Sequence, residues 1–570
     1  MIVLGFSFWK GSHDSSAAIV RDGSLVAAAE EERFSRQKHD GSVPFRAIDF
    51  CLKAAGVTMG EVHLIAYPDR PFRTGAHSQL AEMKSDTLDE IIEDGHARWR
   101  SRVHKKILDI AVKARIARDA GMNPMVEEGF EQLEARYGKL PPVKYYGHHL
   151  AHAAAAYLTS GFDESAVVTI DGRGGPLSAA TWHARDSSID CLDEEPYTNS
   201  LGWFYRDCTR YVGLGDFGEG KLMGLAPYGK ASSQLGTIDK LMDTSGSRWF
   251  KYRSAPASGL VEFPPRRDED VLSGPYADFA AATQHALERG YEKAVRSASG
   301  RARSKKLCVG GGVAMNCSAN GKLLASRVAD DMWLFPASGD AGLSVGAALL
   351  AASEAGEPAR KRIESPYWGP EFTDAEMASA LESRKGIEYT RPENLSGEIA
   401  KSLAAGSIIG WFQGRMELGP RALGNRSILA DPRTIAMRDN VNRVKGREMW
   451  RPLAPSVLAE RTLDWFEDFP PNAFMLFAIQ VKDVTRERAP AIVHVDGSAR
   501  PQPVTRDLNP QYYDLISAFD RLTGVPILLN TSFNAAGEPI VCSPEDALNT
   551  FCSTDLDLLV MGAFVARKAA

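Results

Sequence analysis

Short apolar runs separated by a glycine turn open the chain and predict a sheet. Residues Ile2 to Phe8 are apolar, Ser15 to Val20 are small and apolar, and Ser24 to Glu30 follow the turn Arg21-Asp22-Gly23. An Asp-Gly pair between two apolar runs is a strong short-range signal for a β-hairpin. The beginning of the chain therefore predicts three strands, the last two joined as a hairpin.

A second strand–turn–strand pattern lies at Ser165 to His183, around the turn Asp171-Gly172-Arg173-Gly174-Gly175. Two such hairpins indicate an internally duplicated α/β core of a kind that handles nucleotides. Between them, residues 76–137 carry apolar residues at helical spacing among many charged ones. We interpret 76–137 as a helical insertion, either a cap near the site or a solvated decoration.

A change of composition near residues 351–372 marks a domain boundary. The stretch is polar and charged and ends in a proline-containing segment. Beyond it, Asp374 to Leu381 predicts a new helix and Ser407 to Phe412 a buried strand. The sequence therefore predicts two α/β units, residues 1–362 and 363–570.

Composition is that of a globular protein and narrows the function classes. Hydrophobic residues make up 44% and charged residues 25%, which excludes wholesale disorder. The formal charge of −6 argues against a nucleic-acid partner, because such binding depends on phosphate neutralisation. Seven cysteines without short repeated spacing indicate reduced thiols and a cytoplasmic protein. No apolar run approaches the ~20 residues of a membrane span.

A histidine cluster at residues 148–152 has the spacing of a metal site. On the helix that the alanine-rich sequence predicts, His148 and His152 lie one turn apart on one face, while His149 points elsewhere. Asp171 and Asp340 each sit beside glycine after an apolar stretch. Imidazole with carboxylate favours a borderline or hard divalent ion such as iron, manganese or zinc. The histidine spacing alone favours a purely structural pair, and the two aspartates beside glycine make the structural pair and the metal site equally open.

Two glycine-rich segments have features of anion-binding turns. Gly310-Gly311-Gly312-Val313 follows a short strand and precedes a predicted helix, so its backbone can approach a ligand closely. It matches neither common nucleotide fingerprint, so a plain strand–helix turn is the alternative. Residues 220–229 predict a glycine-bounded loop whose lysine, Lys221, can meet an anion.

The C-terminal half is rich in arginine set among glycines, in Gly414 to Ser427, and more basic residues follow as far as Arg451. The planar guanidinium group suits bidentate recognition of phosphate and carboxylate. The polar run Leu529 to Asn534 adds amide and hydroxyl donors after an apolar strand. A phosphate-bearing substrate is therefore expected in the second domain. In the first domain, His13 ends the loop after the first strand, where a general base can sit.

Together these motifs closely resemble the bacterial O-carbamoyltransferase family, which includes nodulation, aminoglycoside and cephamycin carbamoyltransferases. Blocks in the same order along nearly the whole chain carry the resemblance: His13-Asp-Ser-Ser-Ala, Glu30-Glu-Glu-Arg-Phe-Ser-Arg, Gly147-His-His-Leu-Ala-His-Ala, Met223-Gly-Leu-Ala-Pro-Tyr-Gly, Gly310-Gly-Gly-Val-Ala-Met-Asn, Trp411-Phe-Gln-Gly-Arg-Met-Glu, Gly419-Pro-Arg-Ala-Leu-Gly-Asn-Arg-Ser and Leu529-Asn-Thr-Ser-Phe-Asn.

The resemblance implies a duplicated actin-like (ASKHA) N-terminal domain similar to the universal threonylcarbamoyl transferase, and a C-terminal α/β domain similar to the YrdC family. In that family the C-terminal domain makes carbamoyl-adenylate from ATP and carbamoyl phosphate. The N-terminal domain then passes the carbamoyl group to an acceptor hydroxyl. The implied acceptor is a specialised metabolite of antibiotic, sugar or polyketide type.

The resemblance also assigns roles to matching residues. It implies His13 as the catalytic base, an iron-type divalent ion in the transfer domain, and Mg²⁺ with ATP. The implied metal ligands are His148, His152, Asp171 and Asp340; the nucleotide contacts are Gly310, Gly311, Gly312, Val313 and Asn316; the carbamoyl phosphate and ATP contacts are Arg415, Arg421, Lys445, Arg451, Asn530 and Ser532.

Three other functions are weighed against this one. The first is a small-molecule kinase of the sugar-kinase fold, which has no need of a second anion site. The second is a transferase acting on tRNA, which the net charge opposes. The third is a non-catalytic metal-binding module. The sequence leaves the acceptor undefined, and both a monomer and a homodimer are open.

Overall fold

The computed structural model describes residues 1–8, 13–69, 124–246, 248–267, 270–272, 274–469 and 474–569. Most of the helical insertion expected at 76–137 lies outside these residues; its described end is the helix α6 (Pro124–Tyr137). No helix in the described ranges is both long and apolar enough to cross a bilayer.

The first sheet is built from the strands predicted at the start of the chain. Its order is β3-β2-β1-β4-β5. The β1–β2 and β2–β3 pairs are antiparallel, and the β1–β4 and β4–β5 pairs are parallel. The strands are β1 (Ile2–Ser7), β2 (Ser16–Arg21), β3 (Ser24–Glu30), β4 (Leu64–Tyr67) and β5 (Val143–Tyr145).

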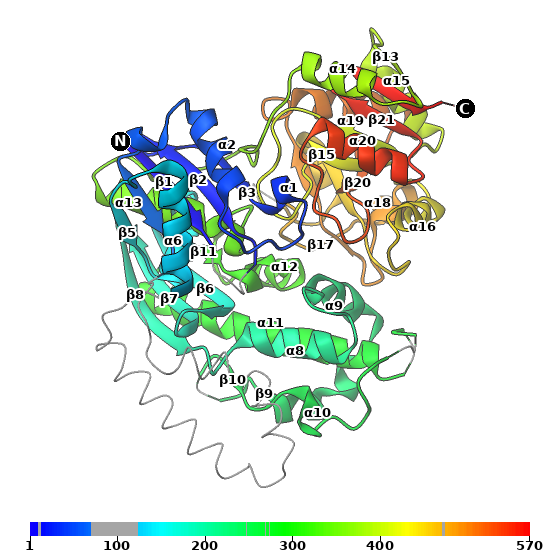
Figure 1. The fold of residues 1–570 in the computed structure, drawn as a ribbon. Coiled ribbons are helices and arrows are strands. Elements are labelled where there is room, and N and C mark those ends of the chain that lie inside the picture. The colour runs from blue at the N-terminus through cyan, green and yellow to red at the C-terminus, as the bar shows by residue number, and fades with distance from the viewer. Residues whose placement is uncertain are drawn as a thin grey trace.

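The second sheet repeats this arrangement. Its order, β8-β7-β6-β11-β12, has the same antiparallel meander followed by two parallel strands. The predicted duplication, and with it the actin-like class of the N-terminal domain, is confirmed by this repeated topology (Figure 1). The strands are β6 (Glu164–Gly174), β7 (Leu177–Arg185), β8 (Ser188–Pro196), β11 (Lys306–Gly310) and β12 (Asp331–Leu334).

Two helices rich in small residues, α7 (His148–Leu158) and α13 (Leu343–Glu354), pack tightly against each other. A Cβ atom at Gly346 would lie 2.0 Å from the carbonyl oxygen of Ala151, so only glycine permits this approach. At Gly5 of β1 a Cβ atom would lie 2.1 Å from the carbonyl oxygen of Ser344. This packing fixes α7, and therefore its histidines, relative to both sheets.

The C-terminal α/β domain contains one eight-stranded mixed sheet, of order β13-β22-β21-β14-β15-β20-β16-β19. Its strands are β13 (Ile387–Thr390), β14 (Ile409–Phe412), β15 (Arg426–Ala430), β16 (Ala454–Leu458), β19 (Gln502–Val504), β20 (Ile527–Ser532), β21 (Leu558–Met561) and β22 (Phe564–Lys568). Its principal helices are α14 (Asp374–Ser383), α15 (Leu395–Ala404), α16 (Ile435–Val444), α19 (Pro510–Thr523) and α20 (Pro544–Ser553). The predicted boundary at 362/363 falls between α13, which ends at Glu354, and α14.

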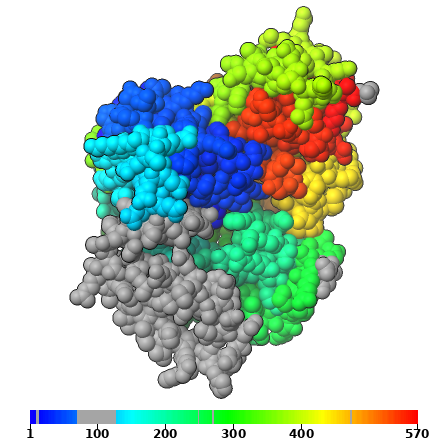
Figure 2. All heavy atoms as spheres, in the orientation of Figure 1, coloured from blue at the N-terminus to red at the C-terminus, as the bar shows by residue number. Residues whose placement is uncertain are grey.

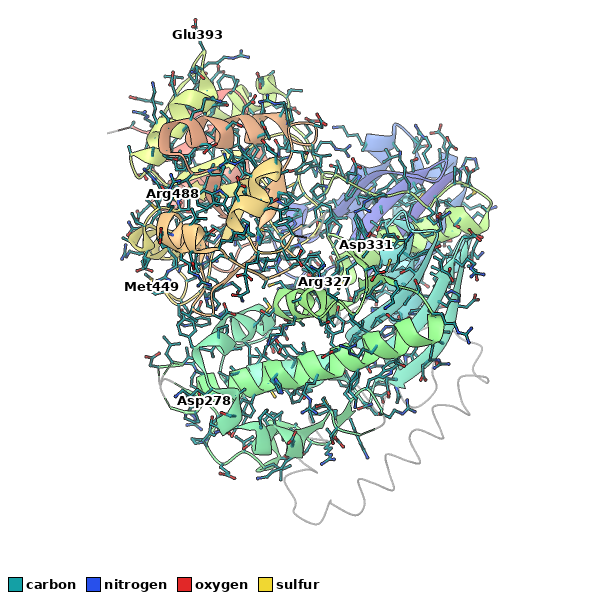
Figure 3. The ribbon with its side chains drawn as sticks, turned by 180° about the vertical axis from the view of Figure 1, so that it is seen from behind. Asp278, Arg327, Asp331, Glu393, Met449 and Arg488 are labelled. Carbon is teal, nitrogen blue, oxygen red and sulfur yellow. The ribbon has the colours of Figure 1, made fainter. Side chains whose placement is uncertain are left out.

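The two domains are packed together and share one continuous apolar core. Figure 2 shows the blue N-terminal segment lying directly against the red C-terminal part. There Arg36 donates hydrogen bonds to the carbonyl oxygens of Pro539, at 2.9 Å, and Ile540, at 2.7 Å. Seen from behind, the long helix α11 (Tyr276–Ala302) runs along the N-terminal domain from the end marked by Asp278 (Figure 3).

The expectation of a loop at residues 220–229 is wrong. These residues lie largely in the helix α9 (Glu219–Leu225) and the following 3-10 turn, Ala226–Tyr228. Gly224 faces the C-terminal domain, where an added Cβ atom would lie 3.3 Å from Pro452. The glycine therefore serves close packing between domains rather than a turn.

Candidate functional site

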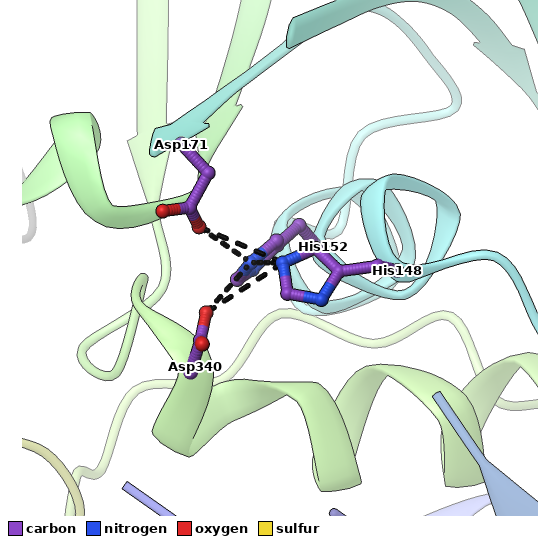
Figure 4. A group of neighbouring side chains, drawn as sticks. All are labelled: His148, His152, Asp171 and Asp340. Atoms are coloured by element: carbon purple, nitrogen blue, oxygen red, sulfur yellow. Dashed lines mark hydrogen bonds and ion pairs between the residues drawn. The ribbon is translucent and has the colours of Figure 1, made fainter. Parts of the chain in front are cut away.

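Four side chains from three parts of the N-terminal domain converge on one point (Figure 4). His148 and His152 project from α7, Asp171 lies in β6, and Asp340 begins the turn before α13. The Nε2 atom of His152 lies 3.1 Å from His148 Nε2, 3.1 Å from Asp171 Oδ2 and 3.4 Å from Asp340 Oδ1. One donor atom from each residue lies within 4.8 Å of all the others. Such separations suit ligands around one ion bound at about 2.0–2.2 Å.

The carboxylate of Asp171 is held in place by the backbone. It accepts hydrogen bonds from the N–H of Gly172, at 2.7 Å, and of Gly312, at 3.1 Å. Burial opposes its charge, but hydrogen bonds from His148 and His152 hold its pKa well below the usual range. Burial likewise opposes the charge of His152, yet its hydrogen bonds to Asp171 and Asp340 raise its pKa to about 9. The group thus concentrates negative charge that a cation can neutralise.

His149 supplies no donor atom to this group, as its helical position predicts, although its ring lies edge to face against those of His148 and His152. Its Nδ1 lies 3.1 Å from the hydroxyl of Thr169, which also accepts a hydrogen bond from Trp182. Burial lowers the pKa of His149 to about 3, so it is a neutral core residue.

The glycine turn adjoins the same four residues. Gly311 has φ +90°, and a Cβ atom there would lie 2.3 Å from the carbonyl oxygen of Ile170. Gly312 bonds Asp171, as described above. Asn316 instead caps α12 (Cys317–Ala325) and exchanges two 3.0 Å hydrogen bonds with Gln284. The backbone of the turn therefore lies next to the four converging side chains. The Asn316 side chain is already hydrogen-bonded to Gln284.

His13 lies beside the four residues and is oriented by a carboxylate. Its Nδ1 lies 2.8 Å from Asp14 Oδ2, and the other oxygen of Asp14 lies 2.8 Å from Nδ1 of His39. Burial opposes protonation, but the hydrogen bond with Asp14 and the charges of Asp340 and Asp171 raise the pKa of His13 to about 10. The Nε2 atom of His13 is thus the one left to face a ligand.

A second constellation in the C-terminal domain consists of cations that are buried or half-buried. Burial and the charge of Arg500 lower the pKa of Arg421 to about 9. Burial and the charges of Arg451 and Arg500 lower the pKa of Arg447 to about 9 as well. Burial, Arg447 and Arg451 lower the pKa of Lys445 well below its usual range. Arg421 Nε, Arg447 Nη2 and Arg500 Nε are buried without a hydrogen-bond partner. We call Arg421, Lys445, Arg447, Arg451 and Arg500 the cationic cluster.

Neighbouring guanidinium groups of like charge that hold buried N–H atoms without a partner are costly without an anion. The cationic cluster therefore has the chemistry of a phosphate site. Its members Arg447 and Arg500 are absent from the contacts that the family resemblance implies. Their signals were present in the spacing of basic residues up to Arg451 and in the loop around Arg500.

The other predicted anion contacts divide into two groups. Ser532 belongs with the cluster, because Lys445 Nζ donates to its carbonyl oxygen and to the Asn534 carbonyl at 2.9 Å. Asn530 contacts the loop that carries Arg421, because its amide donates a 3.2 Å hydrogen bond to the carbonyl of Ala422. Arg415 is elsewhere: it donates to the carbonyls of Val26 and Trp368 at the domain boundary, at 3.1 and 2.9 Å.

Cations and acids from both domains link the two constellations. Lys221 of α9 pairs with Glu448 at 3.1 Å, and Arg451 pairs with the same carboxylate at 3.5 Å. Lys38 lies near Glu32 and within the electrostatic reach of Arg451 and Lys221. The N-terminal cluster around His13 and the cationic cluster therefore approach each other at the domain boundary.

Comparison with known proteins gives a consistent result. Residues 3–349 match the family described as Carbamoyltransferase N-terminus, and residues 400–568 match Carbamoyltransferase C-terminus. An uncharacterized protein of Synechocystis sp. is 36% identical over 100% of this chain and 97% of its own length. The nodulation protein NolNO of Sinorhizobium fredii is 39% identical over 98% of this chain and 79% of its own. The nodulation protein NolO of Bradyrhizobium diazoefficiens is 44% identical over 74% and 78%.

Proposed function

Because the chain belongs to the carbamoyltransferase family, we propose that it is an ATP-dependent O-carbamoyltransferase working in two steps. The C-terminal domain hydrolyses carbamoyl phosphate with one water molecule to carbamate and phosphate. The carbamate oxygen then attacks the α-phosphorus of ATP, which gives carbamoyl-adenylate and releases pyrophosphate. The N-terminal domain passes the carbamoyl group to a hydroxyl and releases AMP. The observation that carries the proposal is the cationic cluster, whose buried guanidinium N–H groups lack partners.

The first step uses the cationic cluster. Arg421, Lys445 and Arg451, with Ser532, bind the phosphate groups of ATP and carbamoyl phosphate, and Mg²⁺ accompanies ATP. Because Lys445 is buried and the arginines of the cluster are half-buried, these charges act in a medium of lower dielectric constant than water and favour an anion more strongly than they would in water. Asn530 holds the loop that carries Arg421 through its hydrogen bond to Ala422. Arg415 ties the segment just before that loop to Val26 of the N-terminal domain.

The second step uses the glycine turn and the four converging side chains. Gly310, Gly311 and Gly312 have no side chain and let the turn, which continues into Val313, lie close to the adenylate. Asn316 caps the helix that follows. His148, His152, Asp171 and Asp340 hold an iron-type divalent ion. The mixed imidazole and carboxylate donors and their mutual distances support this assignment. Such an ion supplies Lewis acidity towards the carbamoyl-adenylate.

His13 removes the proton from the acceptor hydroxyl. An alcohol is a weak nucleophile near neutral pH, so a positioned base lowers the barrier. Asp14 fixes the ring of His13 through Nδ1 and leaves Nε2 towards the acceptor. With a divalent cation bound by the four ligands, the charges of Asp171 and Asp340 would be offset, and the pKa of His13 would fall towards that of a base.

Isotope exchange between pyrophosphate and ATP tests this function. The full-length protein should catalyse exchange only when carbamoyl phosphate is present, because only then does a reversible adenylate form. Absence of exchange with Mg²⁺ and both substrates contradicts the proposal. Formation of ADP with a sugar and no exchange identifies a kinase instead.

A further inference from the structure

Three residues with unusual backbone conformations meet beside His13. Asp14, His39 and Phe217 come from separate segments, and their φ angles are +60°, +57° and +56°. Asp14 touches His39, and the His39 ring stacks on the Phe217 ring. Aspartate and histidine tolerate the left-handed region, but phenylalanine rarely adopts it. Strained backbone of this kind costs about 1–3 kcal/mol per residue and gathers at ligand-binding sites.

Phe217 presents an open aromatic face. Its ring centroid lies 3.9 Å from that of His39 at an interplanar angle of 18°, and 5.0 Å from that of His13 at 80°. The residue is nevertheless 49% exposed. A partner stacked on one side of a ring covers only that side, so the opposite side of Phe217 is open to a ligand. A large apolar side chain in a strained, half-exposed position gains little from folding alone.

Hydrogen-bonding groups border this aromatic face. Asp14 engages Nδ1 of both imidazoles, which leaves the Nε2 atoms of His13 and His39 for other partners. The His13 side chain is 42% exposed. Glu32 accepts a 2.7 Å hydrogen bond from the backbone N–H of His39 and so fixes the position of that residue. An apolar plane rimmed by imidazole and carboxylate groups is adapted to a molecule with a C–H face and a hydroxyl edge.

We propose that Phe217, with His39 behind it and His13 at its edge, forms the acceptor platform and takes a ring-shaped polyol, a pyranose sugar. The axial C–H groups of the sugar lie on the open face of Phe217, which directs a ring hydroxyl to Nε2 of His13. Open-chain polyols carry the same hydroxyl groups but no flat C–H face, so they bind less well. The role of the platform in transfer rests on the proposed function; its binding of a sugar ring does not.

Binding is measured by saturation-transfer NMR on the full-length protein with two probes, methyl β-D-glucopyranoside and sorbitol. Wild-type protein should transfer saturation to the axial protons of the pyranoside, and much less to sorbitol. Phe217→Ala should lower the pyranoside signal about five- to tenfold, in line with the strength of aromatic contacts. Phe217→Tyr should restore it. Leu522→Ala, at an apolar residue that is 52% exposed on α19, is the matched control and should give the wild-type signal.

Equal transfer to both probes, or an unchanged signal in Phe217→Ala, overturns the proposal. The kinetic counterpart is the KM of the pyranoside as acceptor, which should rise about five- to tenfold in Phe217→Ala and recover in Phe217→Tyr. Pyrophosphate exchange by the wild-type protein is recorded alongside. A sugar signal without exchange contradicts the proposed function alone, and exchange without a sugar signal contradicts the platform alone.

Discussion

The backbone N–H of Gly419 donates a 2.8 Å hydrogen bond to Glu30 Oε1, which ties the loop of Arg421 to the N-terminal domain. Arg33 donates to the carbonyl of the same glycine at 2.9 Å and to Glu30 at 3.1 Å. Glu30 and Arg33 are each 3% exposed. Gly419 has φ +98°, and a Cβ atom there would lie 2.9 Å from the carbonyl oxygen of Pro336. The loop that carries Arg421 is thus shaped partly by the N-terminal domain.

This contact predicts that Glu30→Gln weakens phosphate binding from across the boundary. Glutamine keeps an acceptor for Gly419 but removes the charge facing Arg33, which retains only Glu32 at 2.8 Å. Breaking a buried ion pair costs about 3–5 kcal/mol, and the remaining Glu32 reduces this loss. The measurements are the thermal midpoint and the phosphate Kd from calorimetry, and both should worsen.

Arg327→Gln is the matched control for that prediction. Arg327 also pairs across the boundary, with Asp468 at 2.8 Å, but the two side chains are 70% and 39% exposed. An exposed pair contributes about 0–1 kcal/mol, so neither measurement should move appreciably. Equal effects of the two substitutions show that the buried clamp has no special role.

The cationic cluster predicts opposite changes in stability and binding for Arg421→Met. Removing one of several buried like charges relieves repulsion, so the ligand-free protein should unfold at a higher temperature. The stabilisation by phosphate, relative to chloride at equal ionic strength, should fall because a guanidinium partner is lost. Arg391→Met, at an arginine that is 64% exposed and paired with Asp374, should keep the wild-type response. A phosphate response retained by Arg421→Met argues against an anion site.

The geometry of α7 predicts which histidine binds metal. His152→Ala should lose bound divalent ion, measured by elemental analysis after purification with iron or zinc. His149→Phe should keep it, because Nδ1 of His149 lies against Thr169 and its ring meets His148 and His152 only edge to face, a contact that phenylalanine preserves. Loss of metal in both variants, or in neither, contradicts the assignment.

The pKa of His13 should respond to metal. Without an ion, Asp14, Asp340 and Asp171 hold its pKa at about 10, so the ring keeps its proton until the pH rises to that value. A divalent cation at the neighbouring ligands disfavours the protonated ring and should lower this pKa by about one unit or more. NMR titration of labelled histidine, with His13→Asn to assign the signal, gives the value. An identical midpoint with and without the ion contradicts the coupling.

Local patterns in the sequence predicted the framework because they depend on neighbouring residues. The Asp-Gly turn at residue 22 gives the β2–β3 hairpin, and β3 has the predicted bounds Ser24–Glu30. One-turn spacing on an alanine-rich helix brings His148 and His152 together. Both predictions hold because strand residues alternate between the two faces of a sheet and helix residues one turn apart share a face, whatever the rest of the chain does.

Features that depend on contact between distant segments were beyond such patterns. Glycines at 220 and 224 look like loop residues, yet they belong to α9 because Gly224 meets the C-terminal domain. Arg415 lies in the same glycine-rich stretch as Arg421 but turns to backbone carbonyls at the boundary. The convergence of Phe217 with His39 joins residues far apart in the chain. The insertion expected at 76–137 remains a prediction where it lies outside the described residues.

Separation of the two steps by mutation tests the central claim most directly. His152→Ala and Arg451→Ala are compared with wild type for carbamoyl-phosphate-dependent pyrophosphate exchange and for transfer to an acceptor. The account predicts that His152→Ala retains pyrophosphate exchange and loses transfer to the acceptor. Arg451→Ala should lose pyrophosphate exchange, and with it the adenylate that transfer requires. Exchange retained by Arg451→Ala, or exchange lost in His152→Ala, would contradict the division of labour between the two domains.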